Sequence, residues 1–282
     1  MTDKIIDGKL LQGKILEGLK KKISKLKDKP GIALVMVGED AASQIYVNSK
    51  EKNCKKVGIY CERHNLPKNT KDMELLRLID DLNQNQKIHG ILVQMPLPKH
   101  IEEKLIVDAI LPHKDVDGFT PVSLGNMMEG NPLIEPATPR GIMELIDSTK
   151  IDLKGKHVVV IGRSNIVGKP VALMLLARDA TVTVCHSKTK NLGEITKTAD
   201  VLVVACGKAN MIKGDMVKEG AVVIDVGINR VNGKVVGDVD FDSVKDVAGF
   251  ITPVPGGVGP MTIAMMLDNL LKAKELGDKY SV

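Results

Sequence analysis

The chain has 282 residues, enough for two domains of ordinary size, each with its own hydrophobic core. Hydrophobic residues make up 43% of the composition and charged residues 27%, which is typical of a globular protein. Aromatic residues make up only 2%, which argues against the stacking platforms that bind single-stranded nucleic acid. The net charge of +5 is small for this length, so no nucleic-acid partner is expected.

The cysteines and the apolar runs exclude further classes of protein. Cys54, Cys61, Cys185 and Cys206 form no C-x-x-C pair, so neither a disulfide framework nor a metal site is expected. The N-terminus has no apolar signal core, and no apolar run approaches 18 residues. These features predict a cytoplasmic protein with no membrane partner. The Lys-rich stretch at 20–29 is typical of the solvated face of a first, amphipathic helix.

Strand and helix patterns alternate along the first half of the chain. Alternation of this kind is typical of βαβ units and a mostly parallel sheet. A break rich in Gly and Pro at 115–141 follows, and we interpret it as the crossing between two domains. Strands are expected at 32–38, 59–65 and 89–96, and helices at 41–57, 71–86 and 101–111.

The second half repeats the alternation with more apolar strands. Thr138 followed by Pro139 predicts an N-cap and a helix over about 139–148. Continuous apolar runs of the kind found in sheets covered on both faces predict strands at 157–162, 181–185, 201–206 and 221–227. The chain ends in an amphipathic helix, which can stay with the second domain or return to the first.

The stretch HVVVIGRSNIVGKP predicts a strand, a glycine-bearing turn and a helix, although G-x-G-x-x-G is missing. Gly162 and Gly168 let a phosphate approach the backbone N–H groups of a helix start, and the Arg163 guanidinium suits a phosphate. The next strand ends in Cys-His-Ser187-Lys188, without the acid that accepts the ribose hydroxyl of NAD. NADP is therefore expected over NAD. The loop alone leaves open a turn that binds no phosphate.

Three polar residues of the first half are candidates for chemistry. Tyr46 and Lys50 are four residues apart on an expected helix, so they share a face. A partly desolvated lysine there can transfer protons, although an exposed lysine is the simpler interpretation of the spacing alone. Gln94 ends an apolar strand, where the ligands of α/β sheets bind.

Two further segments leave alternatives open. Asp117 lies in D-V-D-G-F, where an Asp before Gly is often a turn residue, and Asp115 competes with it for any chemical role. The segment PVPGGVGP, 253–260, is rigid at its prolines and bare at its glycines. It could lie against a flat ring system or be an ordinary connection.

Eight motifs together resemble the bifunctional methylenetetrahydrofolate dehydrogenase/cyclohydrolase family. In chain order they are GEDAASQIYVNSKEK, GILVQMPLP, KDVDGF, PATPRG, GRSNIVGKP, ACGKANMI, DVGIN and TPVPGGVGPMT. The resemblance covers essentially the whole chain. It implies NADP-dependent oxidation of 5,10-methylenetetrahydrofolate to 5,10-methenyltetrahydrofolate, then hydrolysis to 10-formyltetrahydrofolate. A homodimer paired through the cofactor domain is also implied.

The resemblance further implies an α/β fold of two domains with a cleft between them. Residues 1–119 are expected to form a folate-binding catalytic domain, joined by the C-terminal helix 261–282. Residues 120–260 are expected to form a Rossmann-like, doubly wound NADP-binding domain.

By motif, Lys50 is implied to transfer the proton of hydrolysis, Gln94 to keep it neutral, Tyr46 to flank the folate rings and Asp117 to bind the pterin edge. Substrate contacts are also implied for Pro255, Gly256, Gly257 and Gly259. The implied NADP contacts are Thr138, Gly162, Arg163, Ser164, Ile166, Val167, Gly168, Ser187, Gly207 and Ile228. Ala137 stands where the family often has Cys, which the chemistry does not require.

Three other functions stay open at this point. A dehydrogenase-only relative would lack the hydrolysis step. Such relatives can lack the lysine that is present here as Lys50, so its presence favours two activities. A shikimate-type NADP dehydrogenase shares the two-domain plan but does not explain V-Q-x-P-L-P or P-G-G-V-G-P. A non-catalytic nucleotide-binding module leaves the polar residues of the first half without a role.

Overall fold

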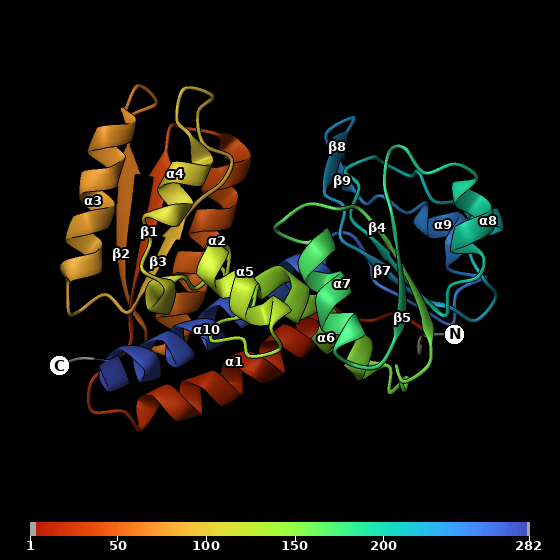
Figure 1. Ribbon diagram of the computed structural model, residues 1–282, viewed down its shortest axis with the longest axis horizontal. Helices are drawn as coiled ribbons and strands as arrows, with labels where there is room; N and C mark the ends of the chain where they lie inside the picture. Colours follow the sequence, from red (N-terminus) through yellow and green to blue (C-terminus); the bar gives the residue numbers. More distant parts are fainter. Residues whose placement is uncertain (1–3, 281–282) are drawn as a thin grey trace. The chain divides into compact units, whose positions relative to one another are not determined.

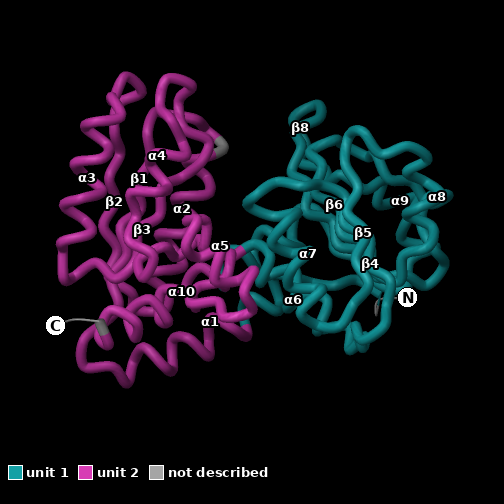
Figure 2. The backbone as a smooth tube through the Cα atoms, in the orientation of Figure 1, with its two compact units in different colours: residues 1–13, 138–264 teal, residues 14–137, 265–282 magenta. Residues whose placement is uncertain are grey.

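A computed structural model describes residues 4–280, which form two compact units (Figure 2). Among the described residues, unit 2 comprises 14–137 and 265–280, and unit 1 comprises 4–13 and 138–264. Both units are α/β with parallel sheets, so the expected fold class is confirmed. Within residues 4–280, no helix is long and apolar enough to cross a membrane.

Unit 2 is built on a three-stranded parallel sheet with the strand order β2-β1-β3 (Figure 1). Its strands are β1 (Gly31–Val37), β2 (Tyr60–Leu66) and β3 (Gly90–Val93). Its helices are α2 (Ala41–Val57), α3 (Asp72–Gln84), α4 (Glu103–Asp108), the 3-10 turn η1 (Pro112–Lys114) and α5 (Pro121–Met128). Two helices belong to both units, α1 (Gly8–Ser24) and α10 (Val258–Tyr280).

The sheet of unit 2 is covered on both faces, which explains why all seven residues of β1 are buried. On one face, alternate residues such as Val35 pack with Ile79 of α3 and Ile106 of α4. On the other face, Gly90 of β3 lies against Val116 and against Leu270 of helix α10. These two side chains leave no room for a side chain at position 90. The C-terminal helix therefore packs on the sheet of unit 2.

Unit 1 is built on a five-stranded parallel sheet with the order β10-β7-β6-β4-β5. Its strands are β4 (His157–Ile161), β5 (Thr181–Cys185), β6 (Val201–Val204), β7 (Val222–Asp225) and β10 (Phe250–Ile251). A hairpin of β8 (Asn229–Val231) and β9 (Lys234–Val236) follows β7. Its helical elements are α6 (Ala137–Ser148), α7 (Gly168–Leu176), α8 (Leu192–Thr196), η2 (Gly214–Met216) and α9 (Phe241–Val244).

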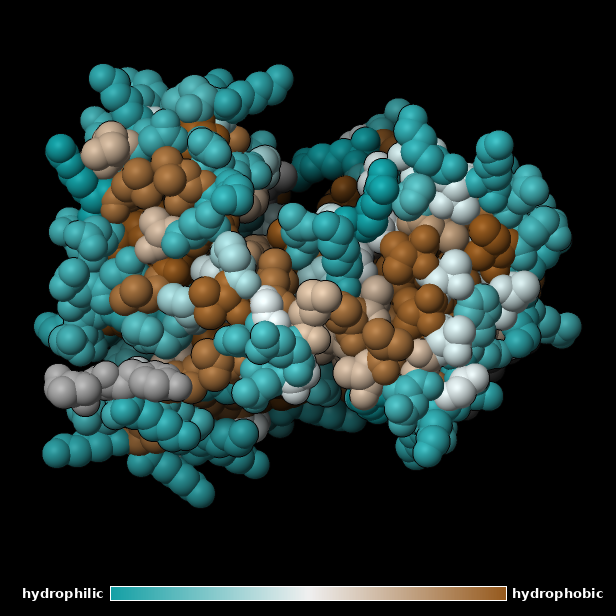
Figure 3. All heavy atoms as spheres, viewed as in Figure 1, coloured by the Kyte–Doolittle hydropathy of each residue, from teal (hydrophilic) through white to brown (hydrophobic). Residues whose placement is uncertain are grey.

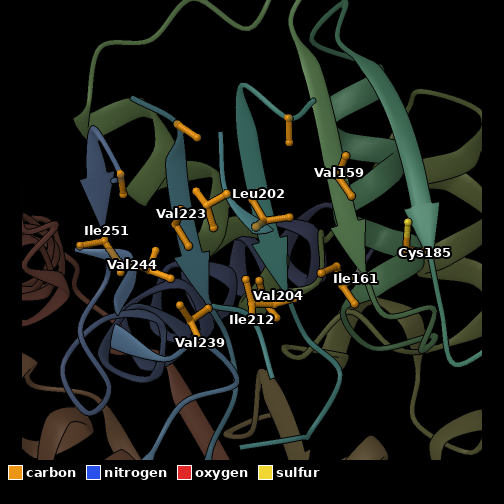
Figure 4. Packing of buried hydrophobic residues seen from close by; sticks show 14 residues of the cluster. Val159, Ile161, Cys185, Leu202, Val204, Ile212, Val223, Val239, Val244 and Ile251 are labelled. Carbon is orange, nitrogen blue, oxygen red and sulfur yellow. The ribbon is translucent and has the colours of Figure 1, made fainter. Parts of the chain in front are cut away.

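The strand order of unit 1 reverses direction between β4 and β6. From β4 the chain moves outward to β5, and it then returns to build β6, β7 and β10 on the other side. Aliphatic side chains from these strands form one core, including Val159, Leu202 and Val223 (Figure 4). In open α/β sheets, ligands bind beyond the carboxyl ends of the strands at this reversal, which here lies beside Gly162 and Ala205.

The bounds of the units differ from the expected domain bounds. Residues 120–137 belong to unit 2, where the Asp115 carboxylate accepts hydrogen bonds from Thr120 N and Ser123 Oγ at the start of α5. Residues 4–13 belong to unit 1, where Ile6 N donates to Ile251 O. Helix α10 divides after Ala264, whereas the expectation assigned 261–282 to the first domain, with 281–282 outside the described residues.

Several short elements differ from the sequence-based expectation. Helix α5 lies inside the segment interpreted as an irregular crossing, with Thr120 as its N-cap and Pro121 in its first turn. Helix α6 begins at Ala137, so the N-cap predicted at Thr138 is wrong and this residue lies in the first turn instead. The hairpin β8–β9 and strands as short as β10 are too brief for a periodic pattern to show.

Candidate active site and cofactor loop

Lys50 lies in the buried stripe of α2. Val47, Lys50, Cys54 and Val57 follow the spacing of one helical face and are all buried, with Lys50 only 7% exposed. An ionisable amine thus occupies a position where an aliphatic side chain would pack. Burial lowers the pKa of the Lys50 amine below 10.5, although the carboxyl group of Asp117 opposes this shift. The amine is therefore easier to deprotonate than a surface lysine.

Gln94 holds the Lys50 amine from the neighbouring strand. It lies just beyond β3, where its backbone N–H donates to Val35 O at 2.8 Å and extends the sheet by one residue. Its side-chain Nε2 donates to Met95 O at 2.7 Å, which turns Oε1 toward Lys50. Lys50 Nζ donates to this Oε1 at 3.1 Å. A neutral amide oxygen accepts from the amine without adding a full negative charge.

The two aspartates of D-V-D-G-F have different surroundings. The Asp115 carboxylate accepts from Gly118 N at 2.9 Å, Thr120 N at 2.7 Å and Ser123 Oγ at 2.9 Å. These bonds shape the turn and hold Thr120, the N-cap of α5, so Asp115 has a structural role there. Asp117 instead interacts electrostatically with Lys50, and burial raises the pKa of its carboxyl group above 3.8.

Four predicted residues, Tyr46, Lys50, Gln94 and Asp117, are thus found in unit 2. Lys50 contacts Gln94 and lies within electrostatic range of Asp117. Tyr46 lies one helical turn before Lys50 on α2 and is partly buried. Burial shifts the pKa values of Lys50 and Asp117 toward their neutral forms, against their mutual attraction. The group can exchange protons with a ligand bound against it.

The predicted cofactor loop connects β4 to α7 in unit 1. Gly162 has φ +127°, and a Cβ there would lie 2.2 Å from Ala205 O. A Cβ on Gly168 would lie 2.2 Å from Gly162 O, so both glycines are needed for the tight turn. Ser164 Oγ accepts from Val167 N at 3.2 Å and Gly168 N at 3.3 Å, which caps the start of α7.

The end of β5 lies beside this loop and is basic. Gly162 N donates to Cys185 O at 2.9 Å, which joins the loop to the last residue of β5. Arg163 is exposed on the loop, and Ser187 and Lys188 are exposed just beyond β5. Ile166 is also exposed, at 47%. An acid-free edge with two cations is the electrostatic setting that a 2′-phosphate favours.

The other predicted cofactor residues belong to unit 1 as well. Gly207 follows β6 with φ +66°, and Ile228 precedes β8 and is 52% exposed. Thr138 lies on α6, and its Oγ1 is 3.0 Å from Thr262 Oγ1 on α10. Two buried aspartates that sequence patterns did not indicate, Asp225 and Asp238, lie behind Gly207 and the hairpin. Their signal in the sequence is weak, because Asp225 ends a strand and Asp238 lies just beyond one, like many turn residues.

The P-V-P-G-G-V-G-P turn owes its glycines partly to packing. Gly256 has φ +117° and its carbonyl accepts from Lys9 N at 3.1 Å. A Cβ on Gly8 would lie 2.0 Å from Gly257 O, so α1 starts directly against the turn. Pro255 is exposed, and a Cβ on Gly259 would meet nothing within 4 Å. These last two positions leave room for a ligand.

Among residues 4–280, no group of three or more His, Cys, Asp or Glu side chains could hold a metal ion.

The sequence model of the tetrahydrofolate dehydrogenase/cyclohydrolase catalytic domain matches residues 6–117. The model of the NAD(P)-binding domain with the same family name matches residues 136–277. Together these two matches cover most of the chain.

Similar proteins match over nearly the full length. The bifunctional protein FolD of Moorella thermoacetica is 57% identical over 277 residues, covering 97% of this chain and 99% of the relative. The crystal structure of bifunctional FolD from Campylobacter jejuni has a TM-score of 0.94 at 50% identity, covering 96% and 98% of the two chains. Trypanosoma brucei FolD, solved with NADP and an inhibitor, has a TM-score of 0.94 at 37% identity, covering 98% of each chain.

Proposed function

The chain belongs to the tetrahydrofolate dehydrogenase/cyclohydrolase family, and on that premise we propose its function and the roles of its residues. It oxidises 5,10-methylenetetrahydrofolate to 5,10-methenyltetrahydrofolate with NADP, and it hydrolyses that product to 10-formyltetrahydrofolate. The relatives named bifunctional favour both activities over oxidation alone. Family membership also sets aside a shikimate-type dehydrogenase and a non-catalytic module.

The cofactor loop fits NADP in shape and charge. Gly162 and Gly168 keep side chains away from the start of α7, where backbone N–H groups favour a phosphate. Arg163 and Ser187 are exposed on two segments that are linked by the hydrogen bond from Gly162 N to Cys185 O. We assign the 2′-phosphate to this edge, and we assign further contacts to Ser164, Ile166, Val167, Gly207, Ile228 and Thr138.

Hydride transfer needs orientation more than an acid or a base. NADP, when bound, supplies the acceptor for the hydride. The folate nitrogen stabilises the cation that forms when the methylene carbon loses the hydride, so the chain has to hold the substrate in place. We assign this positioning to Tyr46 against the folate rings, Asp117 at the pterin edge and the Pro255–Gly259 turn.

Hydrolysis does need proton transfer, and we assign it to Lys50. Its neutral amine takes a proton from water as the water oxygen bonds to the methenyl carbon. The resulting ammonium returns that proton to the ring nitrogen as the carbon–nitrogen bond breaks, and the new hydroxyl proton leaves to solvent. Gln94 Oε1 orients the amine through the 3.1 Å hydrogen bond without raising its pKa as a carboxylate would. This buried amine with an amide acceptor is the observation that carries the proposal.

The two activities can be tested separately. With 5,10-methenyltetrahydrofolate and no NADP, the purified protein should form 10-formyltetrahydrofolate faster than an enzyme-free control. With 5,10-methylenetetrahydrofolate and NADP, it should also form NADPH. Oxidation without faster hydrolysis would leave a dehydrogenase and remove the role of Lys50.

We also propose a homodimer that pairs through unit 1. Strand β5 is an edge strand of the five-stranded sheet, and an edge can pair with a second strand. Val184 of β5 and Leu176 at the end of α7 are 40% and 60% exposed. Figure 3 shows hydrophobic side chains gathered over β5 and α7. A cytoplasmic location and the absence of nucleic-acid and membrane partners stay predictions of the sequence.

A further inference from the structure

Two buried aspartates lie at the carboxyl edge of the sheet in unit 1, outside the residues assigned to NADP. Asp225 ends β7 and is 3% exposed, and Asp238 follows the β8–β9 hairpin and is 0% exposed. Burying a carboxylate costs free energy unless hydrogen-bond donors surround it. The donors therefore show what each aspartate holds in place.

Asp238 joins two separate segments through one carboxylate. Its Oδ2 accepts from Cys206 N at 2.7 Å and Gly207 N at 2.8 Å, just beyond β6. Its Oδ1 accepts from Asn229 Nδ2 at 2.8 Å, at the start of β8. Bonds from two consecutive backbone N–H groups fix the direction in which the chain leaves β6.

Asp225 holds Asp238 in turn. Its Oδ1 accepts from Gly227 N and Asp238 N, both at 2.9 Å, and its Oδ2 accepts from Val239 N at 3.0 Å. A Cβ on Gly227 would lie 2.3 Å from Asp238 Cγ, so the two segments touch. The arrangement leaves little freedom for the Asp238 carboxylate.

The segments that Asp238 joins lie where a dinucleotide is expected. Ala205, directly before Cys206, donates from its N–H to Ile161 O at 2.7 Å, across the strand reversal between β6 and β4. Gly207 and Ile228 are the two NADP contacts assigned beyond β6 and β7. Gly207 donates to Asp238 directly, and Ile228 is the neighbour of Asn229.

We propose that Asp238 is a positioning residue for NADP. By binding Gly207 N and the Asn229 side chain, it sets the spacing of the two backbone segments that receive the cofactor, and it does not touch the cofactor itself. Asp225 acts behind it by fixing Asp238. The inference rests on the proposed function, since it names a further residue of the same cofactor site.

The test compares four variants with the wild-type enzyme. Asp238→Ala removes all three acceptor contacts, whereas Asp238→Asn keeps one oxygen for the two backbone N–H groups. Asn229→Ala removes one contact. Asp242→Ala is the matched control, because this aspartate lies nearby on α9 with its side chain 86% exposed. Each variant is assayed for NADP affinity by titration, for dehydrogenase KM and kcat, for NADP-independent hydrolysis of 5,10-methenyltetrahydrofolate, and for thermal melting.

Asp238→Ala should raise the Kd and KM for NADP at least tenfold, and Asp238→Asn about threefold. Hydrolysis should stay within twofold of wild type in both variants, since the Lys50 group belongs to unit 2. The control should match wild type. Folded Asp238→Ala with an unchanged Kd for NADP would overturn the proposal, as would equal losses of NADP affinity and hydrolysis, which indicate a merely structural role.

If Asp238→Ala does not fold, Asn229→Ala carries the test. It should raise the Kd for NADP at least threefold, and an unchanged Kd would overturn the proposal. A wild-type enzyme without either activity would instead contradict the proposed function. An active wild-type enzyme whose variants all keep the NADP affinity would contradict this inference alone.

Discussion

Replacing Lys50 by Met separates the two activities most sharply. Methionine keeps the length and apolar stem of lysine in the buried stripe of α2, but it removes the amine 3.1 Å from Gln94 Oε1. A positioned acid or base contributes about 10² to 10⁴ in rate. Lys50→Met should therefore lower kcat for hydrolysis of 5,10-methenyltetrahydrofolate at least about 100-fold. The Kd for NADP should stay within about twofold, because the cofactor loop belongs to unit 1.

The stability of this variant should change little. Gln94 Oε1 loses its donor, which costs about 1–3 kcal/mol. The loss of a buried amine, whose burial is unfavourable, offsets part of that cost. The net change should therefore stay within about 2 kcal/mol, or a shift in Tm of less than about 8 °C for a chain of this size.

The assay follows the decrease in 5,10-methenyltetrahydrofolate without NADP, corrected for the enzyme-free rate. Lys52→Met is the matched control, because Lys52 lies on the same helix and is exposed. It should hydrolyse the substrate at the wild-type rate. Hydrolysis by Lys50→Met at the rate of this control would refute the assigned role of Lys50.

Three further predictions follow from the geometry. Gln94→Glu places a carboxylate beside the Lys50 amine and raises the pKa of this amine. Because hydrolysis needs the neutral amine, kcat/KM for hydrolysis should rise at higher pH than in wild type. An unchanged pH profile would contradict the role of Lys50. Ser187→Asp should repel the 2′-phosphate and lower the ratio of kcat/KM for NADP over NAD about tenfold, or about 1.4 kcal/mol. An unchanged ratio would exclude this edge as the site of the 2′-phosphate. Gly168→Ala places a Cβ 2.2 Å from Gly162 O, so it should destabilise the fold by about 1–3 kcal/mol in thermal unfolding. It should also raise the KM for NADP. A wild-type Tm would show that the turn adapts freely.

The longer elements of the fold could be predicted from sequence because their patterns persist for several turns or residues. The helix expected at 41–57 is observed as α2 with the same bounds, and the apolar run at 181–185 is β5. At short elements such as α5 and the β8–β9 hairpin, the Asp115 and Asp238 carboxylates accept hydrogen bonds that a periodic pattern does not show. Their local sequence resembles a loop, so periodicity does not indicate them.

The candidate site could be predicted only in part. Spacing alone places Tyr46 and Lys50 on one helical face but does not show which face is buried, and the burial of Lys50 is what changes its chemistry. Likewise, Asp115 and Asp117 look equivalent in sequence, and only the donors around Asp115 separate a structural carboxylate from a candidate ligand. Asp238 accepts hydrogen bonds from Cys206 N and Gly207 N, which are over 30 residues away in the chain, so local patterns cannot reveal its role.

The central claim is that one chain couples oxidation by NADP to hydrolysis through Lys50. The most direct measurement mixes the purified protein with NADP and 5,10-methylenetetrahydrofolate and quantifies NADPH and the folate products together. NADPH and 10-formyltetrahydrofolate are expected, with 10-formyltetrahydrofolate formed faster than it is from the methenyl compound in an enzyme-free control. NADPH with only the methenyl product would contradict the role of Lys50, and the absence of NADPH would contradict the assignment of the cofactor loop.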